Sequence, residues 1–232
     1  MEIINPVEIV TATIAALAQR ARAGQISRAM HPILWRLRFA VRRPGREQVR
    51  EFILARMPRG GAVAEIGVDL GDFSAKILKI NRPRALHLID PWMVEGGEYG
   101  QFAGAGRTSA AGAARALKAP ERYDFVRQRL AKEIANGQVM VHREDSRVVA
   151  ATFADASLDW VYIDGNHSYE YVKADLEGYF PKVKAGGYIV CDDYHYAGFW
   201  DDGVTRAVDE FVAAGAVRPI FKRRSQFVMR KR

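Results

Sequence analysis

Short apolar segments alternate with helix-forming segments from residue 60 onward, and this alternation most constrains the fold. Five segments have the composition of buried strands: 62–66, 85–90, 138–142, 158–164 and 188–192. Helices are expected between and after them, at 72–80, 121–136, 168–180 and 203–214. Such alternation predicts right-handed βαβ units and a mostly parallel sheet. With a C-terminal antiparallel hairpin at 217–221 and 226–229, we predict a doubly wound, seven-stranded α/β fold.

The two ends of the chain differ from its middle. The 232 residues carry a formal charge of +8, but residues 1–50 hold nine Arg against three Glu. Residues 222–232 hold six Lys and Arg and no acid, so the middle is mildly acidic. Basic ends can bind nucleic acid, anionic lipid or an acidic partner, or remain solvated.

The segments outside the alternating pattern suggest an extension and an insertion. Helix-forming residues at 7–24 and 44–57 predict an N-terminal helical extension over 1–58, before a main domain over 59–232. Residues 92–119 are rich in Gly and Ala, and we expect an insertion that acts as a lid. The segment His31–Arg43 interleaves apolar residues with Arg. Packing on the main domain or on a second subunit of a homodimer is favoured over peripheral contact with a membrane.

The sequence favours a cytoplasmic location. No run of about 18 apolar residues predicts a spanning helix, and the first residues, MEIINPVEIV, lack the basic region of a secretory signal. The single cysteine, Cys191, excludes an internal disulfide framework and fits a reducing compartment.

Every predicted strand ends in a polar cluster. In parallel sheets, ligands bind beyond the carboxyl ends of the strands. After the first strand, residues 65–71 read E-I-G-V-D-L-G, which lacks the dinucleotide fingerprint G-x-G-x-x-G. Glu65 and Asp69 would repel a pyrophosphate and attract a cationic ligand with an amine and a sulfonium. Asp90, which ends the second strand, could accept both hydroxyls of a ribose.

These motifs resemble the class I S-adenosylmethionine-dependent methyltransferases, which have a Rossmann-like fold. The similarity is strongest to metal-dependent sugar and small-molecule O-methyltransferases, which share I-D-G-x-H-x-Y-x-x-V-x-x-D and G-G-x-I-x-x-D-D. Here those stretches occupy residues 163–175 and 186–193. The resemblance covers about residues 60–215. It implies S-adenosylmethionine as the cofactor and a hydroxyl as the methyl acceptor.

The resemblance implies cofactor-binding residues at the first three strand ends: Glu65, Gly67, Gly71, Phe73, Ser74, Asp90, Trp92, Asp145 and Ser146. Glu65 would lie near the cofactor amine, and the two glycines would pass under its methionine part. Asp90 would hold the ribose, and Trp92 would flank the ligand. Asp145 and Ser146 would contact the adenine edge, or would instead cap the following helix.

The fourth and fifth strand ends predict a catalytic centre. Asp164, Asp192 and Asp193 should converge if the strands are neighbours, and oxygen ligands favour Mg²⁺ or another hard divalent cation. The alternative is that Asp193 caps a loop and no metal binds. His167, beside Asp164, is the candidate base that accepts the proton of the acceptor hydroxyl. Otherwise His167 lines the pocket or bonds the cofactor carboxylate.

Four side chains after the fifth strand are candidate acceptor-binding residues: Tyr194, His195, Tyr196 and Trp200. They could stack on a sugar, or form a local hydrophobic plug. The predicted function is metal-assisted O-methylation of a sugar or another small polyol. The alternatives are a nucleic-acid methyltransferase recruited by the basic ends and a non-catalytic cofactor-binding protein. No N-P-P-[YF] motif supports the first, and the retained acids and His167 argue against the second.

Overall fold

The structure is a computed structural model that describes residues 44–92, 119–196 and 201–232. The chain divides into a unit of residues 1–52 and a unit of residues 53–232. Helix α3 (Arg46–Leu54) runs across that division. The predictions for residues 7–24, for His31–Arg43, for the lid and for Trp200 fall outside the described residues. No helix in the described ranges is both long and apolar enough to span a membrane.

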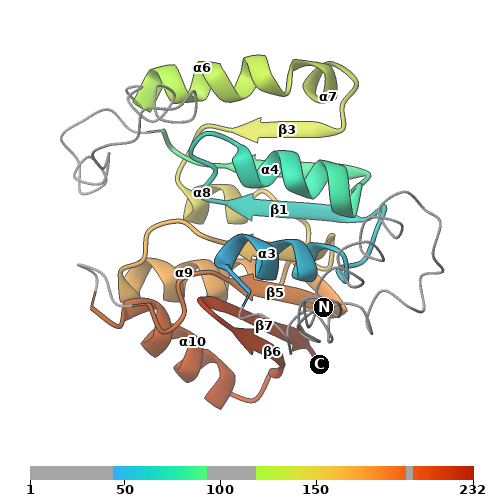
Figure 1. Cartoon of the computed structure of the whole chain (residues 1–232). Coiled ribbons are helices and arrows are strands. Elements are labelled where there is room, and N and C mark those ends of the chain that lie inside the picture. Colours follow the sequence, from blue (N-terminus) through green and yellow to red (C-terminus); the bar gives the residue numbers. More distant parts are fainter. Residues whose placement is uncertain (1–43, 93–118, 197–200) are drawn as a thin grey trace, which may run out of the picture. The chain divides into compact units, whose positions relative to one another are not determined.

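A seven-stranded sheet forms the larger unit, and its order is β3-β2-β1-β4-β5-β7-β6 (Figure 1). The strands are β1 (Ala62–Ile66), β2 (Ala85–Ile89), β3 (Val139–His142), β4 (Leu158–Ile163), β5 (Val183–Cys191), β6 (Val217–Arg223) and β7 (Gln226–Lys231). Strands β1 to β5 pair in parallel, and β7 pairs antiparallel with both β5 and β6. The predicted doubly wound sheet with an antiparallel C-terminal hairpin is confirmed.

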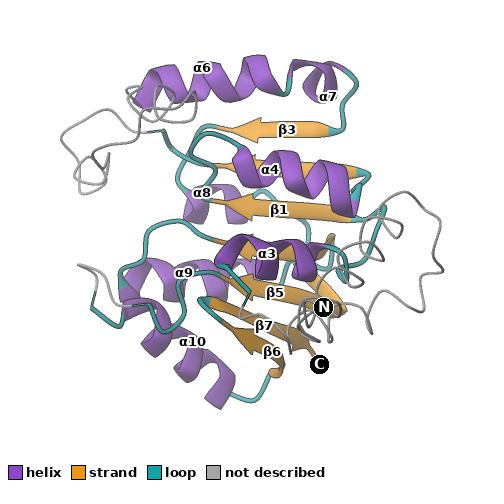
Figure 2. Ribbon diagram, viewed as in Figure 1, coloured by secondary structure: helices purple, strands orange, loops and turns teal. Residues whose placement is uncertain are grey.

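Helices connect the strands and cover the sheet (Figure 2). They are α4 (Asp72–Lys76), which continues as the π-helical turn η2 (Ile77–Asn81), α6 (Ala119–Arg129), α7 (Ala131–Ala135), α8 (Ser146–Ala150), α9 (Tyr169–Tyr179) and α10 (Gly203–Ala213). The single helix expected over 121–136 is two helices that meet at Leu130. Helix α8 begins where one of the two interpretations of Asp145 and Ser146 places a capped helix, although no helix was assigned over 146–150.

The two faces of the sheet have different partners. On one face, strand residues such as Val161 and Ile163 form a buried cluster with α8, α9 and α10, for example through Leu176 and Val208. Side chains alternate between the faces along a strand, so Tyr162 points to the other face. There its ring lies 4.2 Å from that of Phe73 in α4, measured between centroids. The central strands are buried on both faces, which explains their continuous apolar composition.

Strand β5 begins earlier than the sequence predicts. Gly186 and Gly187 were expected to precede the strand, but both lie within it, where the register against β4 shifts. A Cβ atom at Gly187 would lie 2.7 Å from the carbonyl oxygen of Asp159. The glycine pair therefore permits the close approach of β4 at an irregular point of the sheet.

Candidate active site

The parallel register places the polar strand ends side by side. Ile66 of β1 pairs with Ile89 of β2 and with Ile163 of β4, and Ile163 pairs with Cys191 of β5. The residues that follow continue this alignment, because the Gly67 N–H donates to the Ile89 carbonyl (2.9 Å). The Asp192 N–H likewise donates to the Ile163 carbonyl (3.0 Å). The polar residues that follow β1, β2, β4 and β5 thus lie along one edge of the sheet.

Asp90 organises the glycine turn that follows β1. Its Oδ2 accepts hydrogen bonds from the backbone N–H groups of Val68 (2.8 Å) and Asp69 (3.0 Å), and its Oδ1 accepts one from Trp92 (2.8 Å). Burial raises the pKa of the Asp90 carboxyl, although the three N–H donors act in the opposite direction. A carboxylate offers about four acceptor positions. Asp90 therefore has about one acceptor position left, on Oδ1, for a ligand hydroxyl.

Gly67 is required by the packing of the protein itself. Its φ is 82°, and a Cβ atom there would overlap the backbone carbonyl of Asp164 at the end of β4. Gly71 has a φ of 71°, but its Cβ would meet the side chains of Val126 and Ser74 at ordinary contact distances of 3.5 to 3.7 Å. Gly67 therefore joins the turn to β4, while Gly71 supplies a left-handed residue before α4.

Glu65 is buried beneath the turn. The Ser74 hydroxyl donates a hydrogen bond to its Oε2 at 2.6 Å, and Ser74 is also fully buried. The neighbouring Phe73 side chain packs against Tyr162. The structure thus brings Glu65, Phe73 and Ser74 together under the glycine turn.

Helix α6 bonds to the outer side of the glycine turn, a contact that no local sequence pattern indicated. Arg122 forms an ion pair with Asp69 (2.6 Å), and Arg129 pairs with Asp72 (2.7 Å) and donates to the Leu70 carbonyl (3.0 Å). Because Arg122 compensates the charge of Asp69, the acids that would attract a cationic ligand are Glu65 and Asp90.

Trp92 packs against the glycine turn at Asp69. Its indole Nε1 donates to the Asp69 carbonyl at 2.9 Å, and its ring meets that of Tyr123 edge to face at 5.2 Å. Only 3% of the Trp92 surface is exposed. In this arrangement Trp92 closes the turn, and its predicted contact with the ligand is untested.

Asp145 caps helix α8. Its Oδ1 accepts from the Arg147 backbone N–H (2.9 Å), and the Arg147 guanidinium also bonds both carboxylate oxygens. The first bond is the capping interaction that was one of the two sequence interpretations. The contact with adenine is not tested by the structure.

Ser146 has a buried partner that the sequence did not reveal. Its hydroxyl donates to Asp175 Oδ1 at 2.5 Å, and the Tyr179 hydroxyl donates to its carbonyl at 2.9 Å. Burial raises the pKa of Asp175 to about 7, although the Ser146 bond opposes the shift. Helix α9 thus holds the first turn of α8 through a carboxyl group that is partly protonated at neutral pH.

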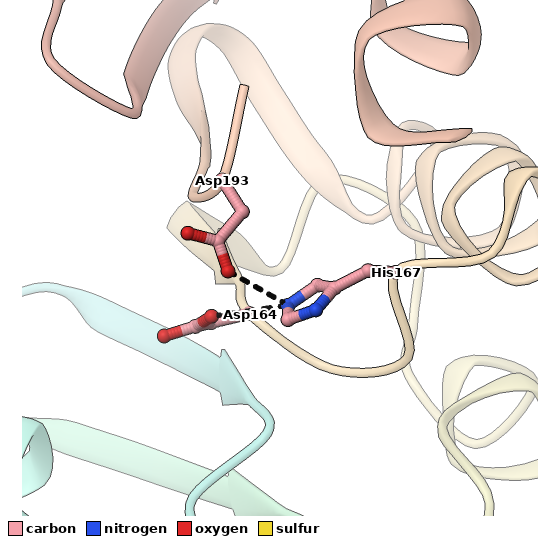
Figure 3. Close-up of side chains that lie close together, drawn as sticks. All are labelled: Asp164, His167 and Asp193. Carbon is pink, nitrogen blue, oxygen red and sulfur yellow. Dashed lines mark hydrogen bonds and ion pairs between the residues drawn. The ribbon is translucent and has the colours of Figure 1, made fainter. Parts of the chain in front are cut away.

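Asp164, His167 and Asp193 converge in one cluster (Figure 3). His167 Nε2 lies 3.4 Å from Asp164 Oδ1 and 3.3 Å from Asp193 Oδ2, and the three ligand atoms all lie within 4.8 Å of one another. Burial lowers the pKa of His167, but the neighbouring carboxylates outweigh burial, so the pKa is raised overall. The chain turns toward the cluster at Asp193, where φ is 54°.

The structure does not bring Asp192 into this cluster. Asp192 is buried on the other side of the strand end, where the Tyr162 hydroxyl donates to its Oδ2 (2.7 Å). Ser225 donates to its Oδ1 (2.9 Å), and Gln226 donates to the same oxygen. Asp192 therefore ties β5 to the turn of the C-terminal hairpin, and His167 takes the third position in the cluster.

The segment after Asp193 begins as packed structure. The Tyr194 ring is buried against Phe227, and its hydroxyl donates to Asp209 Oδ1 (2.7 Å). His195 is exposed, and its Nε2 lies 2.7 Å from the Lys222 ammonium. Tyr196 is also exposed. Of the predicted acceptor-binding residues described, His195 and Tyr196 are accessible and Tyr194 is not.

Comparison with known proteins identifies the family. A family model described as a methyltransferase domain matches residues 64–194, which includes the glycine turn and the Asp164–His167–Asp193 cluster. The chain belongs to this family and is a class I S-adenosylmethionine-dependent methyltransferase. Its cofactor is S-adenosylmethionine, as predicted.

Solved structures share the fold with widely different sequences. The O-methyltransferase NovP is 23% identical, with a TM-score of 0.53 over 80% of this chain and 78% of that chain. An rRNA methylase from Streptococcus thermophilus is 8% identical, with a TM-score of 0.53 over 82% and 98%. The 1,6-didemethyltoxoflavin-N1-methyltransferase of Burkholderia thailandensis is 11% identical, with a TM-score of 0.51 over 100% and 92%. At these identities the likeness establishes the fold, and the acceptor must be inferred from the site.

One curated relative matches a short segment. Uncharacterized protein R132 of Acanthamoeba polyphaga mimivirus is 44% identical over 57 residues, which are 24% of this chain. The match covers 25% of that viral protein, so the similarity is between a fragment of each chain.

Proposed function

We propose that the protein transfers a methyl group from S-adenosylmethionine to a hydroxyl of a sugar or another small polyol, assisted by a divalent cation. The observation that carries this proposal is the convergence of Asp164, His167 and Asp193 at the carboxyl ends of β4 and β5. Two carboxylates beside one imidazole provide both cation ligands and a proton acceptor. Removal of a hydroxyl proton requires such groups.

The donor set fits a divalent metal ion. Asp164 and Asp193 each offer a carboxylate oxygen, and like charges this close are stabilised by a shared cation. Because Asp192 lies outside the cluster, the cation ligands would be the Asp164 and Asp193 carboxylates, and oxygen ligands favour hard ions such as Mg²⁺ and Mn²⁺. His167 Nε2 is then left to accept a proton. Mn²⁺ and Mg²⁺ are therefore the ions to test first. A cation bound there would hold the acceptor oxygen and lower the pKa of its hydroxyl.

The other steps of the proposed reaction are assigned to residues of this chain. Glu65, Asp90 and the glycine turn bind the cofactor, which supplies an electrophilic methyl group. His167 accepts the hydroxyl proton at Nε2 as the oxygen attacks the methyl carbon and the carbon–sulfur bond breaks. Alignment of oxygen, methyl and sulfur is the main catalytic requirement. Asp164 and Asp193, whose oxygens lie 3.4 and 3.3 Å from Nε2, stabilise the imidazolium that forms when Nε2 has taken the proton.

The test removes the cation and one of its ligands separately. Methyl transfer to a panel of sugars and vicinal diols should fall after chelation and recover with Mn²⁺ or Mg²⁺. Asp193→Asn should lower kcat/KM by about 100-fold or more, since it removes a ligand and part of the charge beside His167. Calorimetry with S-adenosylmethionine should show cofactor binding retained.

The matched control is Asp155→Asn, which changes an exposed carboxylate that pairs with Lys182. This variant should transfer methyl groups at the wild-type rate. Transfer that is indifferent to chelation and to Asp193→Asn would exclude the metal-assisted mechanism. Methylation confined to nitrogen acceptors would exclude the hydroxyl assignment.

A further inference from the structure

The basic C-terminal segment separates into two groups at opposite ends of the hairpin. Because β7 runs antiparallel to β5, Phe227 pairs with Cys191 and Arg230 pairs with Tyr188. The residues that precede β7, Lys222 to Arg224, therefore lie toward the carboxyl end of β5, where Asp193 follows. The residues Arg230 to Arg232 lie toward the opposite end of the sheet.

The second group makes structural bonds to the backbone. Arg230 Nε donates to the Gly186 carbonyl (2.8 Å), and the Lys231 ammonium donates to the carbonyls of Phe180 and Val183 (2.8 Å each). These side chains secure the start of β5. Their cationic groups are therefore bonded to backbone carbonyls of the protein itself, and they need no external ligand to explain them.

The first group lies beside the candidate active site. The hairpin turn is fixed there, because the Tyr194 N–H donates to the Ser225 carbonyl (3.0 Å) and Ser225 bonds Asp192. The Lys222 ammonium lies 2.7 Å from His195 Nε2 and 4.5 Å from the centre of the Tyr194 ring. Lys222 of β6 thus contacts His195, which follows Asp193 of the Asp164–His167–Asp193 cluster by two residues.

The contacts of Lys222 do not neutralise its charge. Its partners are the His195 imidazole, the Tyr194 ring and the Tyr194 hydroxyl at 3.5 Å. Within the described ranges no carboxylate forms an ion pair with Lys222; Asp209 is bonded to the Tyr194 hydroxyl instead. An ammonium has only donors, so His195 must present an unprotonated Nε2 to it. An anion that takes the place of this contact would accept from the Lys222 ammonium, and from the His195 ring in the tautomer that carries its proton on Nε2.

We propose that Lys222 and His195 bind a carboxylate or phosphate group carried by the methyl acceptor. The acceptor is then an acidic polyol, such as a sugar acid or a sugar phosphate. The placement of this anion site on the proposed acceptor side rests on the proposed function, but the binding of an anion by the pair does not. Two donors on separate elements, β6 and the segment after β5, would fix the orientation of such a group.

Anion binding by Lys222 and His195 is tested separately from methyl transfer. Inorganic phosphate is titrated into the full-length protein while the His195 ring signals are followed by NMR, with those of His142 as an internal reference. The wild type should show a saturable shift of His195, and Lys222→Met should weaken the apparent affinity about tenfold. Lys184→Met is the control, because Lys184 is half-exposed and pairs with Asp159 at the far end of β5. Equal affinities in the wild type and Lys222→Met would overturn the proposal.

Specificity is tested with matched acceptors. Methyl glucuronide and glucose 6-phosphate are each compared with methyl glucoside, so the two arms distinguish a carboxylate from a phosphate. The wild type should prefer one anionic acceptor, and Lys222→Met should lower that preference ratio about tenfold. A wild type that methylates neutral and anionic acceptors equally would overturn the assignment of this anion to the methyl acceptor and leave the proposed function intact. Saturable phosphate binding that requires Lys222, without transfer to any hydroxyl, would support the anion site and defeat the proposed function.

Discussion

The glycine turn and the Asp164–His167–Asp193 cluster lie at the same edge of the sheet, but their carboxylates are held differently. Around the turn, Glu65 accepts at 2.6 Å and Asp90 accepts three N–H bonds at 2.8 to 3.0 Å. In the cluster, His167 lies 3.3 and 3.4 Å from the two carboxylate oxygens. Those distances exceed the usual 2.7–3.2 Å of an N–H···O bond.

The difference indicates two modes of ligand binding. The turn is organised by internal bonds, so the cofactor meets a shape that already exists. The cluster combines two carboxylates with one imidazole at longer range, an arrangement that a cation or an acceptor hydroxyl can tighten. We therefore expect substitutions at the turn to affect folding and cofactor binding together, and substitutions in the cluster to affect transfer.

Gly67→Ala should have the largest effect on stability, because Gly67 connects the two regions. A Cβ atom there would overlap the Asp164 carbonyl, and φ is 82°. The free energy of unfolding should fall by at least about 3 kcal/mol, measured by urea denaturation. Gly137→Ala is the control, since Gly137 has a φ of 77° with nothing within 4 Å of its Cβ position. It should cost only about 1 kcal/mol. Equal losses in the two variants would show that backbone conformation, and not the contact with β4, makes Gly67 necessary.

Asp175→Asn should reveal a pH dependence of stability at the contact between α9 and Ser146 of α8. The folded pKa of Asp175 is raised to about 7 from an ordinary value of 3.8. The wild type therefore loses stability as pH rises from about 4 through 7, because the folded state must release a proton that it binds more tightly than the unfolded state. Asparagine keeps an oxygen that can accept from Ser146 and carries no charge.

The stability of Asp175→Asn relative to wild type should improve by about 2 kcal/mol between pH 5 and pH 8. Urea denaturation at the two pH values measures this difference. Asp155→Asn, at an exposed position, should show no such change over the same interval. A constant difference for Asp175→Asn would mean that Asp175 is ionised throughout.

Arg122→Gln should have the smallest effect. The Arg122–Asp69 ion pair is partly exposed, and such pairs contribute about 0.2–1 kcal/mol. The free energy of unfolding should decrease within that range at low salt, and the decrease should shrink as salt screens the pair. Arg218→Gln, at an exposed position on β6, serves as the comparison. A loss that is larger than 1 kcal/mol and independent of salt would indicate that Arg122 packs the turn through more than its charge.

The sheet was predictable because each buried strand is a short apolar run that ends in polar residues. The cluster was partly predictable: Asp164, His167 and Asp193 were all candidates, but Asp192 was assigned to the metal. Both residues lie beyond the end of β5, and Asp193 has a φ of 54°, so the chain has left the strand conformation there. Asp192 and Asp193 therefore have different partners, which the sequence pattern did not reveal.

Contacts between distant segments could not be predicted from local patterns. Ser146 meets Asp175 across 29 residues, and Lys222 meets His195 across 27. Both depend on how helices and antiparallel strands pack. The start of helix α8 was one interpretation of Asp145 and Ser146, but its five residues are too few to display a helical period.

The bonds of Asp192 to Ser225 and Gln226 make the strand end before Asp193 depend on the last part of the chain. The contacts of the glycine turn described above come from residues no later in the chain than Asp164. The strand end that carries Asp193 receives its support from a turn that is synthesised more than 30 residues later. A growing chain can therefore complete the shape for the cofactor first, and the acceptor side becomes fixed only when β7 has inserted between β5 and β6.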